Sequence, residues 1–163
     1  MSDRSHVAVV GVGNPIMSDD GLGEHVIEAL RERGLPDGVV AAHAGTTAFF
    51  ALEAMSGADY AVIVDAVALE GAEPGSIHRY HYREGSFDGS PPEVLMHDFS
   101  FSDALEAGSA TYDLPAELLV IGVQPADVGP GTELSDAVAE RVPDVIEAVR
   151  EEIAAHTRPE AEL

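Results

Sequence analysis

Residues 7–23 read Val-Ala-Val-Val-Gly-Val-Gly-Asn-Pro-Ile-Met-Ser-Asp-Asp-Gly-Leu-Gly and establish the architecture. The apolar opening, Val7–Gly11, is typical of a strand buried on both faces of a parallel sheet. A Gly-x-Gly turn follows, and the adjacent acids Asp19 and Asp20 stand where a helix should begin. Two acids at such a point are either a helix cap or part of a cation site. We expect one carboxylate to be functional and the other either to cap the helix or to support the functional one.

The rest of the chain alternates between strand and helix patterns. Apolar runs predict strands over Val39–Ala42, Tyr60–Val64 and Glu117–Gly122, and an alternating pattern predicts an antiparallel edge strand over Gly75–Tyr82. Helical spacing predicts helices over Asp20–Arg33, Thr46–Met55, Phe99–Ala107 and Leu134–Ala155, the last kinked or split at Pro143. The β-α-β-α-β order with short loops predicts an α/β fold built on a parallel sheet. We expect residues 1–163 to form a single domain, with a core from about residue 6 to 155 and a frayed tail over 157–163.

The charge balance is extreme. The chain has 30 Asp and Glu residues against 8 basic residues, all of them Arg, and its formal net charge is −22. Such a surface disfavours nucleic acid and anionic membranes, because binding of phosphate groups relies on Lys and Arg. An acidic composition without Lys predicts a salt-accumulating, halophilic source, and an acidic mesophilic protein is the alternative.

Several other classes of protein are excluded by composition. The absence of Cys rules out disulfides, thiolate metal sites and a Cys nucleophile. No apolar run reaches the roughly 18 residues that a membrane span needs, and the N-terminus lacks the pattern of a signal peptide. We therefore expect a cytoplasmic protein without a membrane partner.

The strand order predicts where a site should lie. In open parallel sheets, ligands bind beyond the carboxyl ends of the strands. The loop that carries Asp20 follows the first strand, and Asp65 directly follows the third, so the two face one cleft if those strands are neighbours. The structural alternative is that Asp65 caps a turn or accepts backbone N–H groups. A dinucleotide fingerprint is excluded, because Ile16 occupies the third glycine position and His43 replaces the acid that binds ribose.

Five blocks of the chain, taken in order, resemble the nickel-iron hydrogenase maturation endopeptidases. The blocks are Gly11–Gly23, His43–Ala48, Val62–Ala66, His97 with Asp103–Leu105, and Leu119–Pro125 with Leu134–Ser135. They extend over about residues 7 to 150, and together they are far more specific than any one of them. The resemblance implies a three-layer α/β/α sandwich around a five-stranded, mostly parallel sheet with one antiparallel strand, in agreement with the strand pattern.

The resemblance also implies a function. Members of this family remove a C-terminal peptide from the precursor of a nickel-iron hydrogenase large subunit after nickel insertion, so the expected partner is that precursor. The nickel arrives with the substrate, and no other cofactor is expected. We expect a monomer or weak oligomer. The alternatives are a checkpoint protein that binds the metallated precursor without cutting it, and a small-molecule-binding protein on the same scaffold.

By position, the resemblance implies that the metal-contacting and catalytic residues are Asp20, Asp65 and His97. Two carboxylates and an imidazole suit a borderline divalent metal, and a water is the expected attacking group. The residues expected to contact the substrate are Gly13, Asn14, His43, Gly45, Thr46 and Thr47. Two positions depart from the family pattern: His43 stands where some relatives have an acid, and Asp98 where relatives often have Gln.

Overall fold

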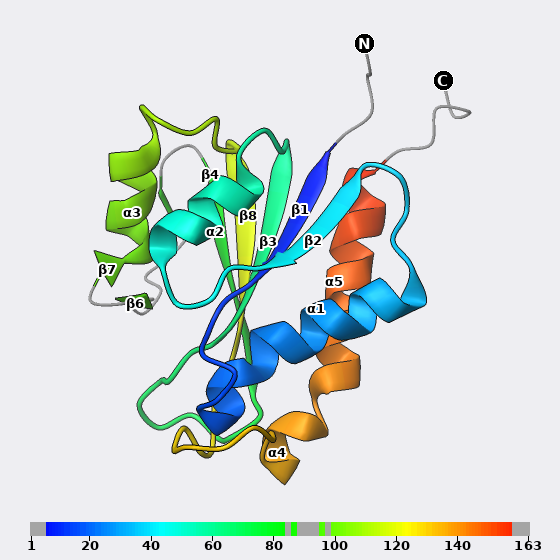
Figure 1. Ribbon diagram of the computed structural model, residues 1–163, viewed down its shortest axis with the longest axis vertical. Helices are drawn as coiled ribbons and strands as arrows, with labels where there is room; N and C mark the ends of the chain where they lie inside the picture. The colour runs from blue at the N-terminus through cyan, green and yellow to red at the C-terminus, as the bar shows by residue number, and fades with distance from the viewer. Residues whose placement is uncertain (1–5, 84–85, 88–94, 97–98, 158–163) are drawn as a thin grey trace.

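A twisted β-sheet runs through the middle of the molecule, and helices cover both of its faces (Figure 1). The structure is a computed structural model that describes residues 6–83, 86–87, 95–96 and 99–157. Its long strands are β1 (Val7–Gly11), β2 (Val39–His43), β3 (Tyr60–Ala66), β4 (Ile77–Arg83) and β8 (Glu117–Val123). Its two-residue strands are β5 (Ser86–Phe87), β6 (Leu95–Met96) and β7 (Phe99–Ser100).

The strands of the main sheet lie in the order β2-β1-β3-β8-β4-β5. Neighbours among the first four run parallel, whereas β4 runs antiparallel to β8. The predicted five-stranded, mostly parallel sheet with one antiparallel strand is therefore confirmed. The short β5 pairs with the last two residues of β4 and adds a sixth strand at that edge, and β6 pairs with β7 apart from the main sheet.

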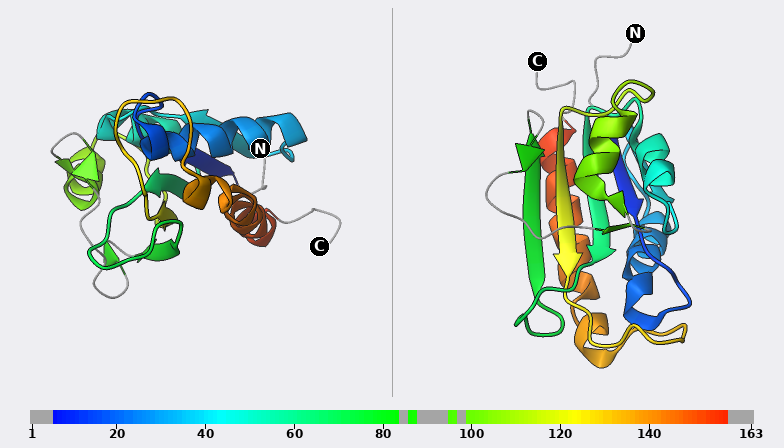
Figure 2. Two further views of the ribbon diagram at one scale, coloured as in Figure 1. Left: turned by 90° about the horizontal axis from the view of Figure 1, so that it is seen from below. Right: turned by 90° about the vertical axis from the view of Figure 1, so that its left-hand side faces the viewer.

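The helices form two layers. They are the 3₁₀ helix η1 (Ser18–Gly21) and the α-helices α1 (Leu22–Arg33), α2 (Ala48–Met55), α3 (Phe101–Gly108), α4 (Asp136–Ala139) and α5 (Val142–His156). Successive residues of a strand point to opposite faces, so Val9 of β1 packs with α1 and α5 while Val10 packs with α2 and α3. The predicted three-layer sandwich is confirmed (Figures 1 and 2). In the described part of the chain, no helix combines the length and apolar character that crossing a membrane requires.

Two helix boundaries differ from the predictions in informative ways. The predicted helix from Asp20 begins later, at Leu22, because the acidic pair belongs to the 3₁₀ turn that precedes α1. The predicted helix over 134–155 is split into α4 and α5, and Pro143 lies in the first turn of α5. A proline is tolerated there because its missing N–H has no partner in the first turn of any helix.

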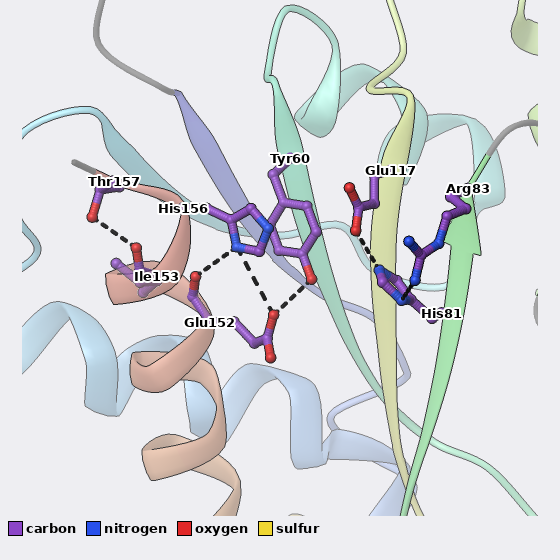
Figure 3. Close-up of polar contacts among 8 residues, drawn as sticks. All are labelled: Tyr60, His81, Arg83, Glu117, Glu152, Ile153, His156 and Thr157. Carbon is purple, nitrogen blue, oxygen red and sulfur yellow. Dashed lines mark hydrogen bonds and ion pairs between the residues drawn. The ribbon is translucent and has the colours of Figure 1, made fainter.

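A polar cluster ties the end of α5 to the amino end of the sheet (Figure 3). The hydroxyl of Tyr60 donates to Oε1 of Glu152 over 2.7 Å, and the ring of His156 stacks on Tyr60 with centroids 3.5 Å apart. Burial raises the pKa of Tyr60 well above its usual range, and the hydrogen bond to Glu152 adds to this effect. The cluster lies at the start of β3, so it fastens the end of the sheet opposite to the predicted site.

Candidate functional site

The carboxyl end of β1 leads into a tight loop that places Asp20 at the edge of the sheet. The backbone N–H of Asn14 donates to Oδ2 of Asp20 over 2.9 Å and closes the loop. Gly13 permits this closure: its φ is +129°, and a Cβ atom there would overlap the carbonyl oxygen of Asp20. Within the described residues, Oδ1 of Asp20 accepts no hydrogen bond, so this oxygen is available to a ligand.

Asp65 lies near the end of β3, the strand beside β1, where Gly11 is in register with Val64. Its side chain is buried, with 5% exposed, and Oδ1 accepts the N–H of Ala66 over 2.8 Å. That bond is the contact expected for a purely structural aspartate, but it satisfies only one oxygen. No fully buried side-chain oxygen in the described residues lacks a partner, so Oδ2 keeps a small contact with solvent.

The electrostatics show that the two carboxylates are close. Burial raises the pKa of the Asp65 carboxyl well above its ordinary value, and the neighbouring charge of Asp20 raises it further. Two carboxylates arranged in this way can share a proton or bind a cation, which would relieve their mutual repulsion. The predicted adjacency of the first and third strands is confirmed, and it brings Asp20 and Asp65 near one another at the carboxyl edge of the sheet.

His97 is the third predicted metal contact, and it lies outside the described residues together with Asp98. Among the residues that the structure does describe, no three His, Cys, Asp or Glu side chains gather closely enough to hold a metal ion. The structure therefore describes Asp20 and Asp65 but not the third predicted metal contact. The metal-binding role of the three residues stays a prediction.

Asp19, the other member of the acidic pair, is fully buried and binds a segment from the far end of the chain. Its carboxylate accepts four hydrogen bonds of 2.7–2.9 Å: from the backbone N–H groups of Ala126, Asp127 and Ser135 and from the hydroxyl of Ser135. Burial alone would raise the pKa of Asp19, but these bonds stabilise the charged form and lower the pKa below its ordinary value.

Of the two alternatives for Asp19, the helix cap is wrong. Gly21 occupies the N-cap of α1, and no side chain makes a capping bond there. Asp19 instead holds the segment 126–135 against the loop that carries Asp20. Two bonds of Ser18 extend this junction: its N–H donates to the carbonyl of Gly131 over 2.9 Å, and its hydroxyl donates to the carbonyl of Gly129 over 2.8 Å.

The loop after β2 meets the Asp20 loop on its other side. The N–H of Gly13 donates to the carbonyl of Gly45 over 2.8 Å, and Nε2 of His43 lies 3.2 Å from the carbonyl oxygen of Gly13. A carbonyl can only accept, so Nε2 carries the hydrogen, and Nδ1 is an acceptor when the ring is neutral. Three of the predicted substrate contacts, Gly13, His43 and Gly45, therefore come together.

A groove of about 410 Å³ opens beside this contact. It is lined by His43, Ala44, Gly45, Phe50, Glu53 and Ala54. Asn14, Thr46 and Thr47 are half-buried along the same loops, and Thr47 occupies the N-cap of α2 without a side-chain capping bond. All six predicted substrate contacts thus lie on the two loops that flank the cleft, and their roles stay predictions.

Two features of this edge were not predicted from the sequence. Nothing in the local pattern indicates that Ser135 is the partner of Asp19, and the doubled acid was the one available signal, because a cap requires a single acid. The exposed apolar side chains of Ile16, Phe50 and Val128 were also not predicted; Phe50 lies in α2, and the other two lie on loops.

Comparison with known proteins gives a consistent result. A family model described as hydrogenase maturation protease (HycI) matches residues 24–152. The solved structure of the hydrogenase maturating endopeptidase HybD from Escherichia coli has a TM-score of 0.78 and 25% sequence identity to this chain, and the match covers 97% of this chain and 99% of that one.

Two curated relatives agree. The hydrogenase 2 maturation protease of Escherichia coli K12 is 29% identical over 146 residues, which cover 88% of this chain and 87% of that protein. The hydrogenase expression/formation protein HupM of Azotobacter chroococcum mcd 1 is 32% identical over 124 residues, or 76% of this chain. That match spans 59% of the length of HupM, so the chain covers less than two thirds of this relative.

Proposed function

The chain belongs to the hydrogenase maturation protease family, and on that basis we propose that it is an endopeptidase acting on a nickel-iron hydrogenase. It removes a C-terminal peptide from the precursor of the large subunit after nickel has been inserted. The observation that supports this proposal most directly is the pair Asp20 and Asp65 in one cleft, where burial and the charge of Asp20 raise the pKa of Asp65. Such a pair favours an incoming cation, and nickel in the precursor is one.

Nickel is part of the substrate in this proposal. Asp20, Asp65 and His97 contact it, and the protein thereby holds only the metal-loaded precursor in position for cleavage. A water attacks the carbonyl carbon of the scissile peptide bond. One of the two carboxylates takes the proton from that water, and the proton then passes to the leaving nitrogen as the C–N bond breaks.

The flanking loops bind the peptide that is removed. Gly45 has a positive φ and open space where a Cβ atom would stand, so its backbone is accessible to a peptide, while the buried Gly13 positions the neighbouring loop. Nδ1 of His43, an acceptor in the tautomer described above, can take a hydrogen bond from a peptide N–H. Asn14, Thr46 and Thr47 supply further polar groups along the same path.

The experiment is to incubate nickel-loaded precursor with the protein and to measure the mass of the product. We expect the wild type to release a C-terminal peptide and to leave metal-free precursor intact. Asp65→Asn should slow release by at least about 100-fold, the scale of a lost acid–base group. The control is Glu147→Gln, which removes one negative charge from an exposed position of α5 and should leave the rate within about twofold.

Other outcomes separate the alternatives. A stable complex with loaded precursor and no loss of mass would support the non-cleaving checkpoint. Absence of both binding and cleavage would leave the small-molecule-binding protein. Normal cleavage by Asp65→Asn would contradict the proposed role of the carboxylate pair.

A further inference from the structure

Large apolar side chains are unevenly exposed on this molecule. In the described part of the chain, four of them are mostly or nearly half exposed: Ile16 at 62%, Phe50 at 60%, Val128 at 51% and Val40 at 45%. Ile16 follows β1, Phe50 follows β2 and Val128 follows β8, so three of the four stand on segments that leave the carboxyl ends of strands. These three are called the apolar rim here, and Val40 lies within β2.

The segments that carry the rim are joined to one another. The Ile16 loop is bonded to the loop that leads to Phe50 by the N–H of Gly13, which donates to the carbonyl of Gly45. On the other side, the N–H of Gly131 donates to the carbonyl of Ile16 over 2.9 Å. The loop after β1 and the segment between β8 and α4 lie side by side near the lower edge of Figure 1, and Figure 2 shows them from below. The rim is therefore part of one built surface.

The rim segments adjoin the loop that carries Asp20. Asp20 closes the loop that has Ile16 at its tip, because its carboxylate accepts the N–H of Asn14 while the N–H of Ile16 donates to Oδ1 of Asn14. Asp19 fastens the segment that carries Val128 to the residue before Asp20. The side chain of Phe50 lines the groove beside His43.

A single exposed apolar residue is ordinary, but three on bonded segments beside Asp20 call for an explanation. Apolar side chains around a polar centre exclude water when a partner covers them. Exclusion of water strengthens the attraction between a carboxylate and a cation, since the effective dielectric constant falls. A partner that fits is a folded protein surface that has apolar groups around a metal cation. An acidic protein surface, including a second copy of this chain, is disfavoured by the net charge of −22.

We propose that Ile16, Phe50 and Val128 form a docking rim for the folded precursor and seal its nickel centre against Asp20 and Asp65. This inference rests on the proposed function. It adds that recognition depends on the protein surface around the metal as well as on the metal and the terminal peptide. The rim contributes to binding of the precursor and not to the bond-breaking step.

The test uses Ile16→Ser, Phe50→Ser and Val128→Ser, singly and together, with Val40→Ser as the matched control. Val40 has similar exposure but lies away from the bonded loops. Each rim variant should raise KM for nickel-loaded precursor, by about 10-fold for Phe50→Ser and by about threefold for the two smaller side chains. The value of kcat should change by less than about twofold, and Val40→Ser should match the wild type in both constants.

Two further measurements keep the result clear. Melting temperatures identify a variant that has unfolded, and Phe50→Leu, which keeps an apolar group, should restore most of the lost affinity. Binding of loaded precursor to each rim variant, with Asp20 and Asp65 unchanged, tests the rim even if no cleavage occurs, so failure of the proposed function is separable from failure of the rim. Rim variants that bind and process the precursor like Val40→Ser would overturn the inference.

Discussion

At the scale of single residues, Gly13 and Gly45 share a positive φ but have different surroundings. A Cβ atom on Gly13 would overlap the carbonyl oxygen of Asp20, whereas a Cβ atom on Gly45 would meet nothing within 4 Å. We expect Gly13→Ala to lower the free energy of unfolding by about 2–4 kcal/mol and to abolish processing, because the loop must open and Asp20 must move. Denaturant unfolding and the precursor assay measure the two effects.

Gly45→Ala is the control for this prediction. It has the backbone cost of a left-handed residue, about 1–2 kcal/mol, without the overlap. If Gly13→Ala and Gly45→Ala were equally stable and equally active, the close approach at Gly13 would not matter for the loop.

The ionised carboxylate of Asp65 lowers the free energy of unfolding at neutral pH. Its folded pKa is raised by burial and by the charge of Asp20, so its full contribution to stability is present below about pH 4, where the unfolded carboxyl is also protonated. That contribution is lost as the pH rises towards the folded pKa, because the unfolded chain ionises first. Asp65→Asn cannot ionise, and its amide oxygen keeps the bond to Ala66.

We therefore expect Asp65→Asn to have a free energy of unfolding about 1–3 kcal/mol higher than that of the wild type at pH 7. It should unfold at a higher denaturant concentration. The difference should disappear near pH 3.5. Urea unfolding of the free protein at both pH values measures it. A variant less stable than the wild type at pH 7 would show that the Asp65 charge is better compensated than its contacts indicate.

At the scale of elements, the segment 126–135 and the loop after β1 behave as one unit because Asp19 joins them. Asp19→Asn removes the charge that accepts four hydrogen bonds, and its NH₂ group would face backbone N–H donors. We expect a loss of about 2–4 kcal/mol in the free energy of unfolding at pH 7. The lowered pKa means that Asp19 stabilises the fold above about pH 4 and that this effect is lost as the pH falls through the folded pKa.

The measurement is urea unfolding at pH 7 and again in acid, where the gap between Asp19→Asn and the wild type should narrow. Asp127→Asn is the control in the same segment, because the Asp127 side chain bonds only the nearby N–H of Gly129 at an exposed position. Its effect should stay within about 0.5 kcal/mol. Equal losses for both variants would mean that the segment is not held through Asp19.

Local patterns were sufficient for the elements whose causes are local. The strand Val7–Gly11 has the predicted bounds because an unbroken apolar run must be covered on both faces. The split near Pro143 followed from a proline that lacks an N–H. The predicted start of α1 was Asp20, but the helix begins at Leu22, because Asp19 binds Ser135 and the acidic pair lies in the preceding turn. No spacing rule connects residues so far apart in the chain.

The candidate site also has features that could be predicted from the sequence and features that depend on contacts between distant residues. Strand order alone brought Asp20 and Asp65 to one cleft, since the ends of neighbouring parallel strands must meet at one edge. It did not reveal which member of the acidic pair faces that cleft. The resemblance to a family selected Asp20, and the hydrogen bonds of Asp19 now account for the other member.

At the scale of the whole molecule, 8 arginines face 30 acidic residues, and the formal net charge is −22. Ion pairs between described residues include Arg141–Asp144, His81–Glu117 and His156–Glu152, and two of these three require a protonated histidine. The excess of acidic side chains leaves a net repulsion, which lowers the stability of the compact state.

Salt should relieve this repulsion, because the screening length falls from about 10 Å at 0.1 M to about 3 Å at 1 M. We expect the melting temperature to rise by at least about 5 °C over that range of KCl, and more than in a sugar solution of equal osmolarity. The halophilic source stays a prediction, and a melting temperature that does not respond to KCl would contradict it.

The order of strands in the sheet also determines when the fold can be completed during synthesis. β8 separates β3 from β4, so β4 leaves the ribosome before β8, and β3 keeps an open edge until β8 is made. Asp19 likewise lacks its partners until residues 126–135 have emerged. A nascent chain therefore carries Asp20 on a loop that this segment does not yet support.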